Sequence, residues 1–141
     1  MFLVTREISP YTHHDIIIGI FNNYQEALKA KSLYITNCAT HDKWKEQTYR
    51  EVNLETNITI NDISNQLSIE NNNVNTVYVI SRFEEGFGQI IRFYEKFCYT
   101  NNEAENYISI KEEDEADFPY YYDSEKIIIN NIYFEEQDSN I

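Results

Sequence analysis

Two stretches of this chain, about half its length apart, carry the same kinds of residue in the same order. Residues 2–6 read Phe-Leu-Val-Thr-Arg and residues 78–82 read Tyr-Val-Ile-Ser-Arg, so three apolar residues precede a hydroxyl and an arginine in both. After a polar or glycine-bearing loop, a second run rich in isoleucine and aromatic residues follows at 15–21 and at 90–99. An internal repeat constrains a fold strongly, and this one predicts a single structural unit used twice.

Both second runs end in a pattern typical of a helix N-terminus. Asn23 is followed by Glu26, and Thr100 is followed at the same spacing by Glu103. A side-chain oxygen can therefore accept hydrogen bonds from first-turn amides while the glutamate reaches back. The two copies stay in step from their first strands to these caps, apart from a loop that is longer by a single residue in the second copy. Each copy is expected to contain strand, hairpin, strand, helix, loop and strand.

The last predicted strands lie at 49–60 and 126–135, where β-branched and aromatic residues recur. We therefore predict an α+β fold with a first ββαβ repeat at 1–70, an asparagine-rich linker at 71–76 and a second repeat at 77–141. A unit of this size buries a thin core. The sheets should thus join edge to edge or face to face around a pseudo-two-fold axis, as one globule. The alternative is coincidence, because short apolar runs with caps are common.

Composition narrows the class of partner. The 141 residues include 11 Lys and Arg against 24 Asp and Glu, a formal charge of −13, and 15% are aromatic. The aromatic content favours a folded chain. Nucleic acids and membrane surfaces are polyanionic, so neither is an expected partner. With two cysteines, no long apolar stretch and no secretory signal, a reducing, cytoplasmic location is expected. The abundance of Ile and Asn is similar to that in the proteomes of AT-rich microbes and of some large DNA viruses. For a viral protein, the expected location is the cytoplasm of the host cell.

The charge is uneven, and its densest part is the first candidate site. Residues 1–73 carry 6 basic and 9 acidic side chains and residues 74–141 carry 5 and 15, giving −3 and −10. A predicted acidic loop runs into an aromatic segment, and aromatic groups in a negative field suit docking of a basic protein. The alternative is a solvated loop whose tyrosines pack onto the core. The expected partner-binding residues are Glu112, Glu113, Asp114, Glu115, Asp117, Phe118, Tyr120, Tyr121 and Tyr122.

A second cluster lies in the first copy. Cys38 and His41, expected in the connection after the helix, have the spacing of two zinc ligands, and His13 or His14 in the hairpin loop could join them. Cys38 with His41 is also the only local pair that resembles an activated nucleophile. Neither pattern has the further closely spaced ligands or orienting acid that such a site needs. No metal, cofactor or catalytic residue is therefore assigned.

Other motifs indicate structure. Gly86-Phe87-Gly88 lacks the rest of a phosphate-binding loop and predicts a hairpin turn. Cys98, in an apolar run, is expected to be buried. Arg6 and Arg82, at matching strand ends, could hold an anionic ligand, although pairing with the abundant carboxylates is favoured.

The sequence therefore predicts a non-catalytic binding or adaptor protein whose partner is a protein with a basic surface, inhibited or recruited by docking. Carboxylates resembling phosphates in a nucleic-acid site are one form of this hypothesis. Two alternatives stay open: a small metal-dependent module or enzyme built on Cys38, His41, His13 and His14, and a structural homo-oligomer such as a homodimer.

Overall fold

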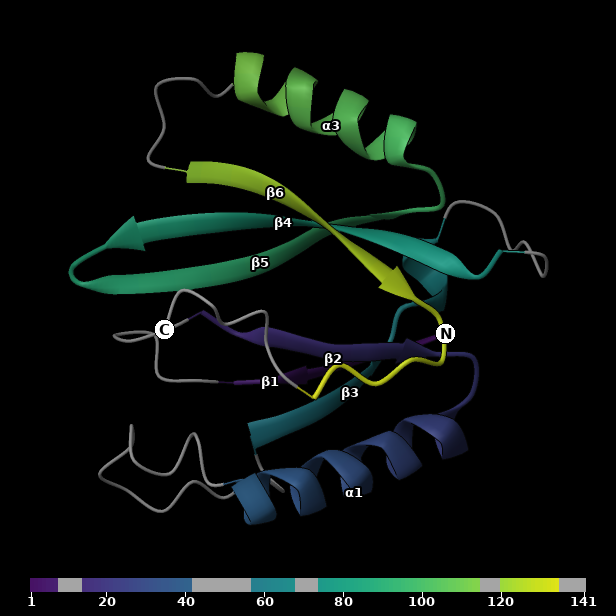
Figure 1. The fold of residues 1–141 in the computed structure, drawn as a ribbon. Coiled ribbons are helices and arrows are strands. Elements are labelled where there is room, and N and C mark those ends of the chain that lie inside the picture. The colour runs from purple at the N-terminus through teal and green to yellow at the C-terminus, as the bar shows by residue number, and fades with distance from the viewer. Residues whose placement is uncertain (8–13, 42–56, 68–73, 115–119, 135–141) are drawn as a thin grey trace.

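The protein has four layers, in the order helix, sheet, sheet, helix (Figure 1). This computed structural model describes residues 1–7, 14–41, 57–67, 74–114 and 120–134. The elements are β1 (Phe2–Arg6), β2 (Ile16–Phe21), α1 (Tyr24–His41), β3 (Ile58–Asp62), the short 3-10 helix η1 (Ser64–Gln66), β4 (Thr76–Gly86), β5 (Gln89–Cys98), α3 (Asn101–Asp114) and β6 (Tyr120–Ile128). The predicted α+β class is confirmed.

The two sheets have the strand orders β2-β1-β3 and β5-β4-β6, with every pair antiparallel. In each sheet the central strand is the first strand of the hairpin, β1 in one sheet and β4 in the other. The register shifts between Val4 and Thr5 in the first hairpin and between Ile80 and Ser81 in the second. These shifts occur at equivalent positions, because aligning the two first strands places Val4 on Ile80 and Thr5 on Ser81.

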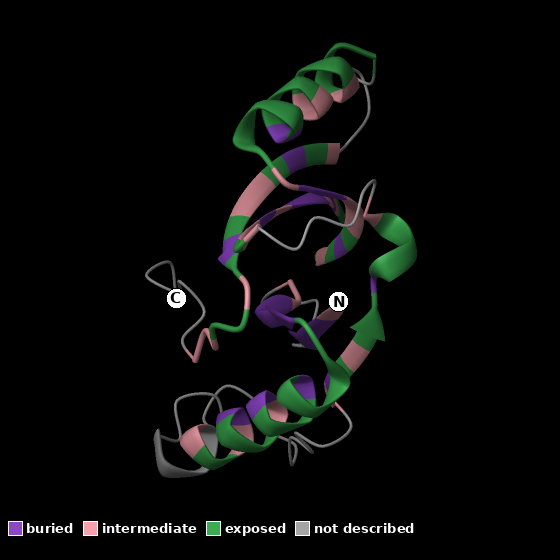
Figure 2. Ribbon diagram, turned by 90° about the vertical axis from the view of Figure 1, so that its right-hand side faces the viewer, coloured by how far each residue is buried: buried purple, intermediate pink, exposed green. Residues whose placement is uncertain are grey.

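The sheets pack face to face, one of the two predicted arrangements. Alternation along each strand sends one set of side chains into the space between the sheets and the other set toward a helix. The inter-sheet core is formed by Leu3, Ile17, Ile20, Ile63, Val77, Val79, Phe97 and Ile127. In each helix the buried residues lie on the side that faces its own sheet, and the exposed residues lie on the outer side (Figure 2). Among the described residues, neither helix combines the length and the apolar sequence that a bilayer span requires.

The predicted helix caps are confirmed. The Asn23 Oδ1 accepts a hydrogen bond from the Glu26 amide at 2.9 Å, and the Thr100 Oγ1 accepts one from the Glu103 amide at 3.2 Å. The next residue in each helix is an alanine, and both alanines are fully buried. A small side chain there lets the first turn approach the sheet closely.

The third strands lie elsewhere than predicted. In the first half β3 begins at Ile58, and 49–56 fall outside the described residues. In the second half β6 begins at Tyr120, before the predicted start at 126, and ends at Ile128. The reason is the length of β4, which pairs with β6 from Thr76 to Glu84, so the aromatic segment assigned to a loop is needed as a strand.

The segment after β6 crosses to the first sheet and runs along the edge of β2 (Figure 1). The amides of Asn130 and Tyr133 donate to the carbonyls of Ile20 and Ile18, each at 2.8 Å. These bonds satisfy an edge that would otherwise expose unpaired backbone groups. The second half of the chain thus completes the sheet of the first half.

Candidate protein-docking surfaces

The outer face of α3 is strongly acidic. α3 contains five acidic residues and one lysine. Ala104 is fully buried against the sheet, and Tyr107 and Ile108 pack beside it. On the outer side Ile110 is 60% exposed, and the residues three and four positions after it are Glu113 and Asp114. We call this surface the acidic α3 face; it consists of Glu103, Glu105, Ile110, Glu112, Glu113 and Asp114, all exposed.

The predicted acidic-aromatic loop is divided by the fold. Glu112, Glu113 and Asp114 form the last turn of α3 rather than a loop, and Tyr120, Tyr121 and Tyr122 begin β6. Glu115, Asp117 and Phe118 lie outside the described residues.

Strand alternation then sends the three tyrosines to opposite faces. Tyr122 is 8% exposed and packs with Ala104 of α3, and the ring of Tyr120 lies on the same side, over Arg82. Tyr121 is on the other side, stacked on Phe83 at 5.0 Å between ring centroids, and is 45% exposed. Tyr121 therefore lies on the face of the sheet opposite α3, and Tyr122 is buried beneath the helix, so the three tyrosines do not form a single exposed surface with the carboxylates of α3.

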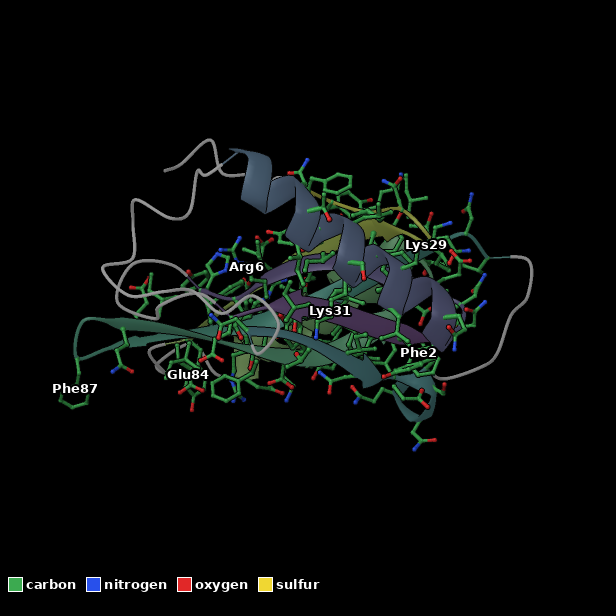
Figure 3. All side chains as sticks on the ribbon, turned by 90° about the horizontal axis from the view of Figure 1, so that it is seen from below. Phe2, Arg6, Lys29, Lys31, Glu84 and Phe87 are labelled. Atoms are coloured by element: carbon green, nitrogen blue, oxygen red, sulfur yellow. The ribbon has the colours of Figure 1, made fainter. Side chains whose placement is uncertain are left out.

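A second surface was missed by the sequence analysis. β1 ends at Arg6, whereas the matching strand β4 continues to Gly86, so the β4–β5 hairpin extends beyond the first sheet. We call residues 82–93 the hairpin arm. Phe87 at its tip is fully exposed and lies far from the other labelled side chains (Figure 3). Ile91 and Phe93 of the arm are also exposed. The sequence indicated this surface only through three large apolar residues, Phe87, Ile91 and Phe93, at and after a glycine turn.

The tip of the arm is a two-residue turn. Gly86 pairs with Gln89, and the intervening Phe87 and Gly88 have φ of 53° and 76°. Positive φ at both central residues is the geometry of a type I′ hairpin turn, which matches the strand twist. The predicted turn is confirmed.

Arg82, at the base of the arm, is held by carboxylates. Its guanidinium lies 2.8 Å from Glu95 and 3.0 Å from Glu84. It also stacks between the rings of Phe93 and Tyr120, at 4.7 and 5.0 Å from their centroids. Burial lowers the pKa of Arg82, but Glu95, Glu84 and Tyr122 together outweigh this, and the pKa is raised. Pairing with carboxylates is confirmed for this arginine.

Arg6, at the matching position, has a different environment. It is 3% exposed, and its Nη1 donates to the Tyr34 hydroxyl at 3.1 Å. This hydrogen-bonding partner belongs to helix α1.

A third arginine, Arg92, links the halves from within the sandwich. Its Nε donates to the Ser81 hydroxyl at 2.8 Å and its Nη1 to the Asp15 carbonyl at 3.0 Å. Its Nη2 lies 3.4 Å from a Glu125 carboxylate oxygen. The side chain is almost fully buried, so its charge depends on these partners. One feature of the sequence indicated that Arg92 is buried. Residues two apart in a strand share a face, so Arg92 lies on the same face as the aromatic Tyr94.

The predicted metal cluster is only partly placed. Cys38 and His41 belong to the last turn of α1 and not to a connection after it; their side chains, and all of His13, lie outside the described residues. The His14 ring packs against Phe83 at 4.8 Å, and its Nδ1 hydrogen-bonds with the Asp15 carbonyl. The described part of the chain contains no group of three His, Cys, Asp or Glu residues that could hold a metal ion.

Cys98 is buried, as predicted, and forms part of the core beneath α3. Burial raises the pKa of its thiol. Because the thiolate is the nucleophile, this environment opposes reactivity.

No family model, curated protein or solved structure matches this chain.

Proposed function

We propose that the protein acts without catalysis, by docking its acidic α3 face onto the basic surface of a partner protein. The observation that carries this proposal is the exposed Ile110 among carboxylates. Protein interfaces combine an apolar centre with a polar rim, and this face has that composition.

The position of the charges supports the same proposal. Glu112, Glu113 and Asp114 occupy the last turn of α3, near the negative end of the helix dipole. Anionic side chains are unfavourable at that end, where lysine or arginine would stabilise the helix. Lys111 is the one basic residue in this turn, so the three acidic residues outnumber it, and residues that break a local stability rule are expected at functional sites.

The field of the whole second half adds a kinetic argument. With a charge of −10 on residues 74–141, the face would steer a basic partner into encounter and repel anionic ones. Such steering weakens as salt shortens the range of the field. One form of the proposal is inhibition, in which the carboxylates occupy a phosphate site of a nucleic-acid-binding partner. Competition between this protein and duplex DNA for that partner tests this form.

The main test is affinity capture of the tagged full chain from its native lysate, at low and at high salt. The test variant carries Glu112→Gln, Glu113→Gln and Asp114→Asn. We expect a stoichiometric partner with a basic surface at low salt, weaker capture at high salt and strongly reduced capture by the variant.

A matched control carries Glu7→Gln, Glu26→Gln and Asp62→Asn. It makes the same three chemical changes and moves the net charge from −13 to −10 as well, but at exposed positions of the first half. Capture equal to wild type is expected from it. Equal loss from both triple variants would show that only net charge matters, and unchanged capture by the α3 variant would show that this face is not the docking surface.

We also infer that the two halves are copies of one ββαβ unit related by a pseudo-two-fold axis. The equal strand orders, the register shifts at equivalent positions and the matching caps at Asn23 and Thr100 support this. The outer helices have diverged in charge. α1 carries Lys29 and Lys31 with one glutamate, whereas α3 carries five acidic residues with one lysine. On this inference the docking face belongs to one copy alone.

A further inference from the structure

Phe87 has a large apolar side chain that folding does not bury. It is fully exposed at the end of the hairpin arm (Figure 3). Burying it would be favourable, and within the described structure nothing buries it.

The backbone at Phe87 adds a second, independent observation. Its φ of 53° lies in the left-handed region, at the first central position of a type I′ turn. Asn, Asp and Gly are preferred there, and a bulky residue is an outlier. Backbone strain of this kind is concentrated at functional sites, so an observed outlier motivates a functional hypothesis.

The base of the arm is stiff. On one face Phe83 is packed between His14, at 4.8 Å, and Tyr121, at 5.0 Å. On the other face Arg82 is stacked between two rings and bound to two glutamates. An anchor presented on a rigid base loses less conformational entropy on binding.

The charge of the arm indicates the kind of partner. Arg92 points its charge into the sandwich, and the Arg82 charge is matched by Glu84 and Glu95. Glu85, two residues before the tip, is exposed, and Glu84 is partly exposed. Among the described carboxylates near the aromatic tip, that of Glu85 is therefore the one that neither arginine of the arm pairs with.

We propose that Phe87 is an anchor residue that inserts into an apolar pocket of a partner protein, while Glu85 faces a Lys or Arg side chain at the rim of that pocket. This inference rests on the proposed function, because that proposal supplies the expectation that the partner has a basic surface. It adds a contact separate from the acidic α3 face. Anchors of this kind dominate binding because a few aromatic side chains in fully desolvated pockets supply most of the affinity.

The first experiment maps the contact. Full-length protein carrying the photo-crosslinking residue p-benzoylphenylalanine in place of Phe87 is irradiated in native lysate, and the crosslinked partner peptide is identified by mass spectrometry. The matched control carries the same residue in place of Leu33, an exposed apolar position on α1. We expect one partner site, apolar and flanked by Lys or Arg, that reacts with position 87 only and is weakened by Glu85→Gln. No crosslink, or the same products from both positions, overturns the proposal, and so does a crosslink only to a second copy of the chain.

The second experiment separates binding from folding. Phe87→Asn supplies the preferred turn residue, so its melting temperature should rise by about 2 °C. Its affinity for the captured partner should fall about tenfold or more, while Phe87→Trp retains binding. Wild-type affinity in Phe87→Asn together with loss in the α3 variant would reject the anchor and keep the proposed function. Loss in Phe87→Asn with wild-type affinity in the α3 variant would reject the α3 face and keep the anchor.

Discussion

Arg92 is a charged side chain buried between two sheets, and it joins segments far apart in the sequence. Its three hydrogen-bonding partners come from β4, from β6 and from the residue before β2. Truncation by Arg92→Ala removes the donor of the Ser81 hydroxyl and one of the two hydrogen bonds of the Asp15 carbonyl, which also bonds His14 Nδ1, and it opens a cavity. We expect this variant to lose about 2–4 kcal/mol of unfolding free energy, measured by urea denaturation.

The control is Glu125→Gln, which changes the most exposed partner of Arg92. Glu125 is 43% exposed and its carboxylate lies 3.4 Å from the guanidinium, so solvent already screens this pair. A cost below about 1 kcal/mol is expected. If Arg92→Ala cost no more than Glu125→Gln, the buried hydrogen bonds would not hold the halves together.

The raised pKa of the buried Tyr94 hydroxyl predicts how the free energy of unfolding depends on pH. Its hydroxyl is buried without a hydrogen-bonding partner among the described residues. Burial raises the pKa of Tyr94 well above its usual value, and Asp15 and Glu125 add to the rise, which the nearby Arg92 and Thr5 side chains oppose only in part. The folded state therefore favours the neutral phenol. That contribution is complete below the ordinary tyrosine pKa, near 10, and is lost as pH rises from there toward the folded pKa.

We expect wild-type protein to lose about 1 kcal/mol more stability than Tyr94→Phe between pH 8 and pH 11, followed by denaturation at each pH. Cys98, whose pKa is also raised, is present in both proteins and cancels in the comparison. At neutral pH the substitution should cost little, because it removes an unsatisfied hydroxyl. Parallel pH curves for the two proteins would contradict this account.

At the scale of elements, the segment after β6 depends on Gly19. A Cβ at this position would lie 2.6 Å from the Asn131 carbonyl oxygen and 2.8 Å from the Phe21 ring. The backbone oxygen cannot move without breaking the hydrogen bonds that hold the segment on β2. Gly19→Ala should therefore destabilise the protein by about 1–3 kcal/mol. It should also speed hydrogen exchange at the Asn130 and Tyr133 amides.

Gly86→Ala is the matched control, because a Cβ there meets nothing within 4 Å. Its cost should stay below about 0.5 kcal/mol, with no change in exchange at those two amides. Slow exchange retained in Gly19→Ala would mean that the segment is held by its apolar side chains rather than by its backbone.

The sequence predicted the elements best where the signal is local. Both hairpins and both helix starts follow from apolar runs, a glycine turn and caps such as Asn23 and Thr100, which act over short stretches of chain. The start of β6 could not be read this way, because it is set by pairing with β4, which β5 and α3 separate from β6 along the chain. The same limit divided the predicted site, since pairing with β4 makes this segment a strand, and successive residues of a strand such as Tyr121 and Tyr122 face opposite sides.

At the scale of the whole molecule, charge and packing are distributed differently. The excess negative charge predicted for the second half is placed by the structure partly on α3, an outer layer, where it can act on a partner. The apolar residues of both halves meet in the middle. A core shared by two sheets cannot be deduced from either repeat alone. The thin core expected for a single repeat nevertheless indicated that each repeat would need to pack against the other.

That shared core predicts that neither half folds by itself. Residues 1–73 alone would expose Leu3, Ile17 and Ile20 and would lose the segment that hydrogen-bonds along β2. We expect fragments 1–73 and 74–141 to lack cooperative melting when separate and to regain it when mixed, measured by circular dichroism. The control is the full chain cleaved at a protease site inserted within 71–76, which should stay folded because all core contacts survive. A cooperative transition in 1–73 alone would show that one sheet and α1 suffice, and the inter-sheet core would then stabilise a fold that each half can already form.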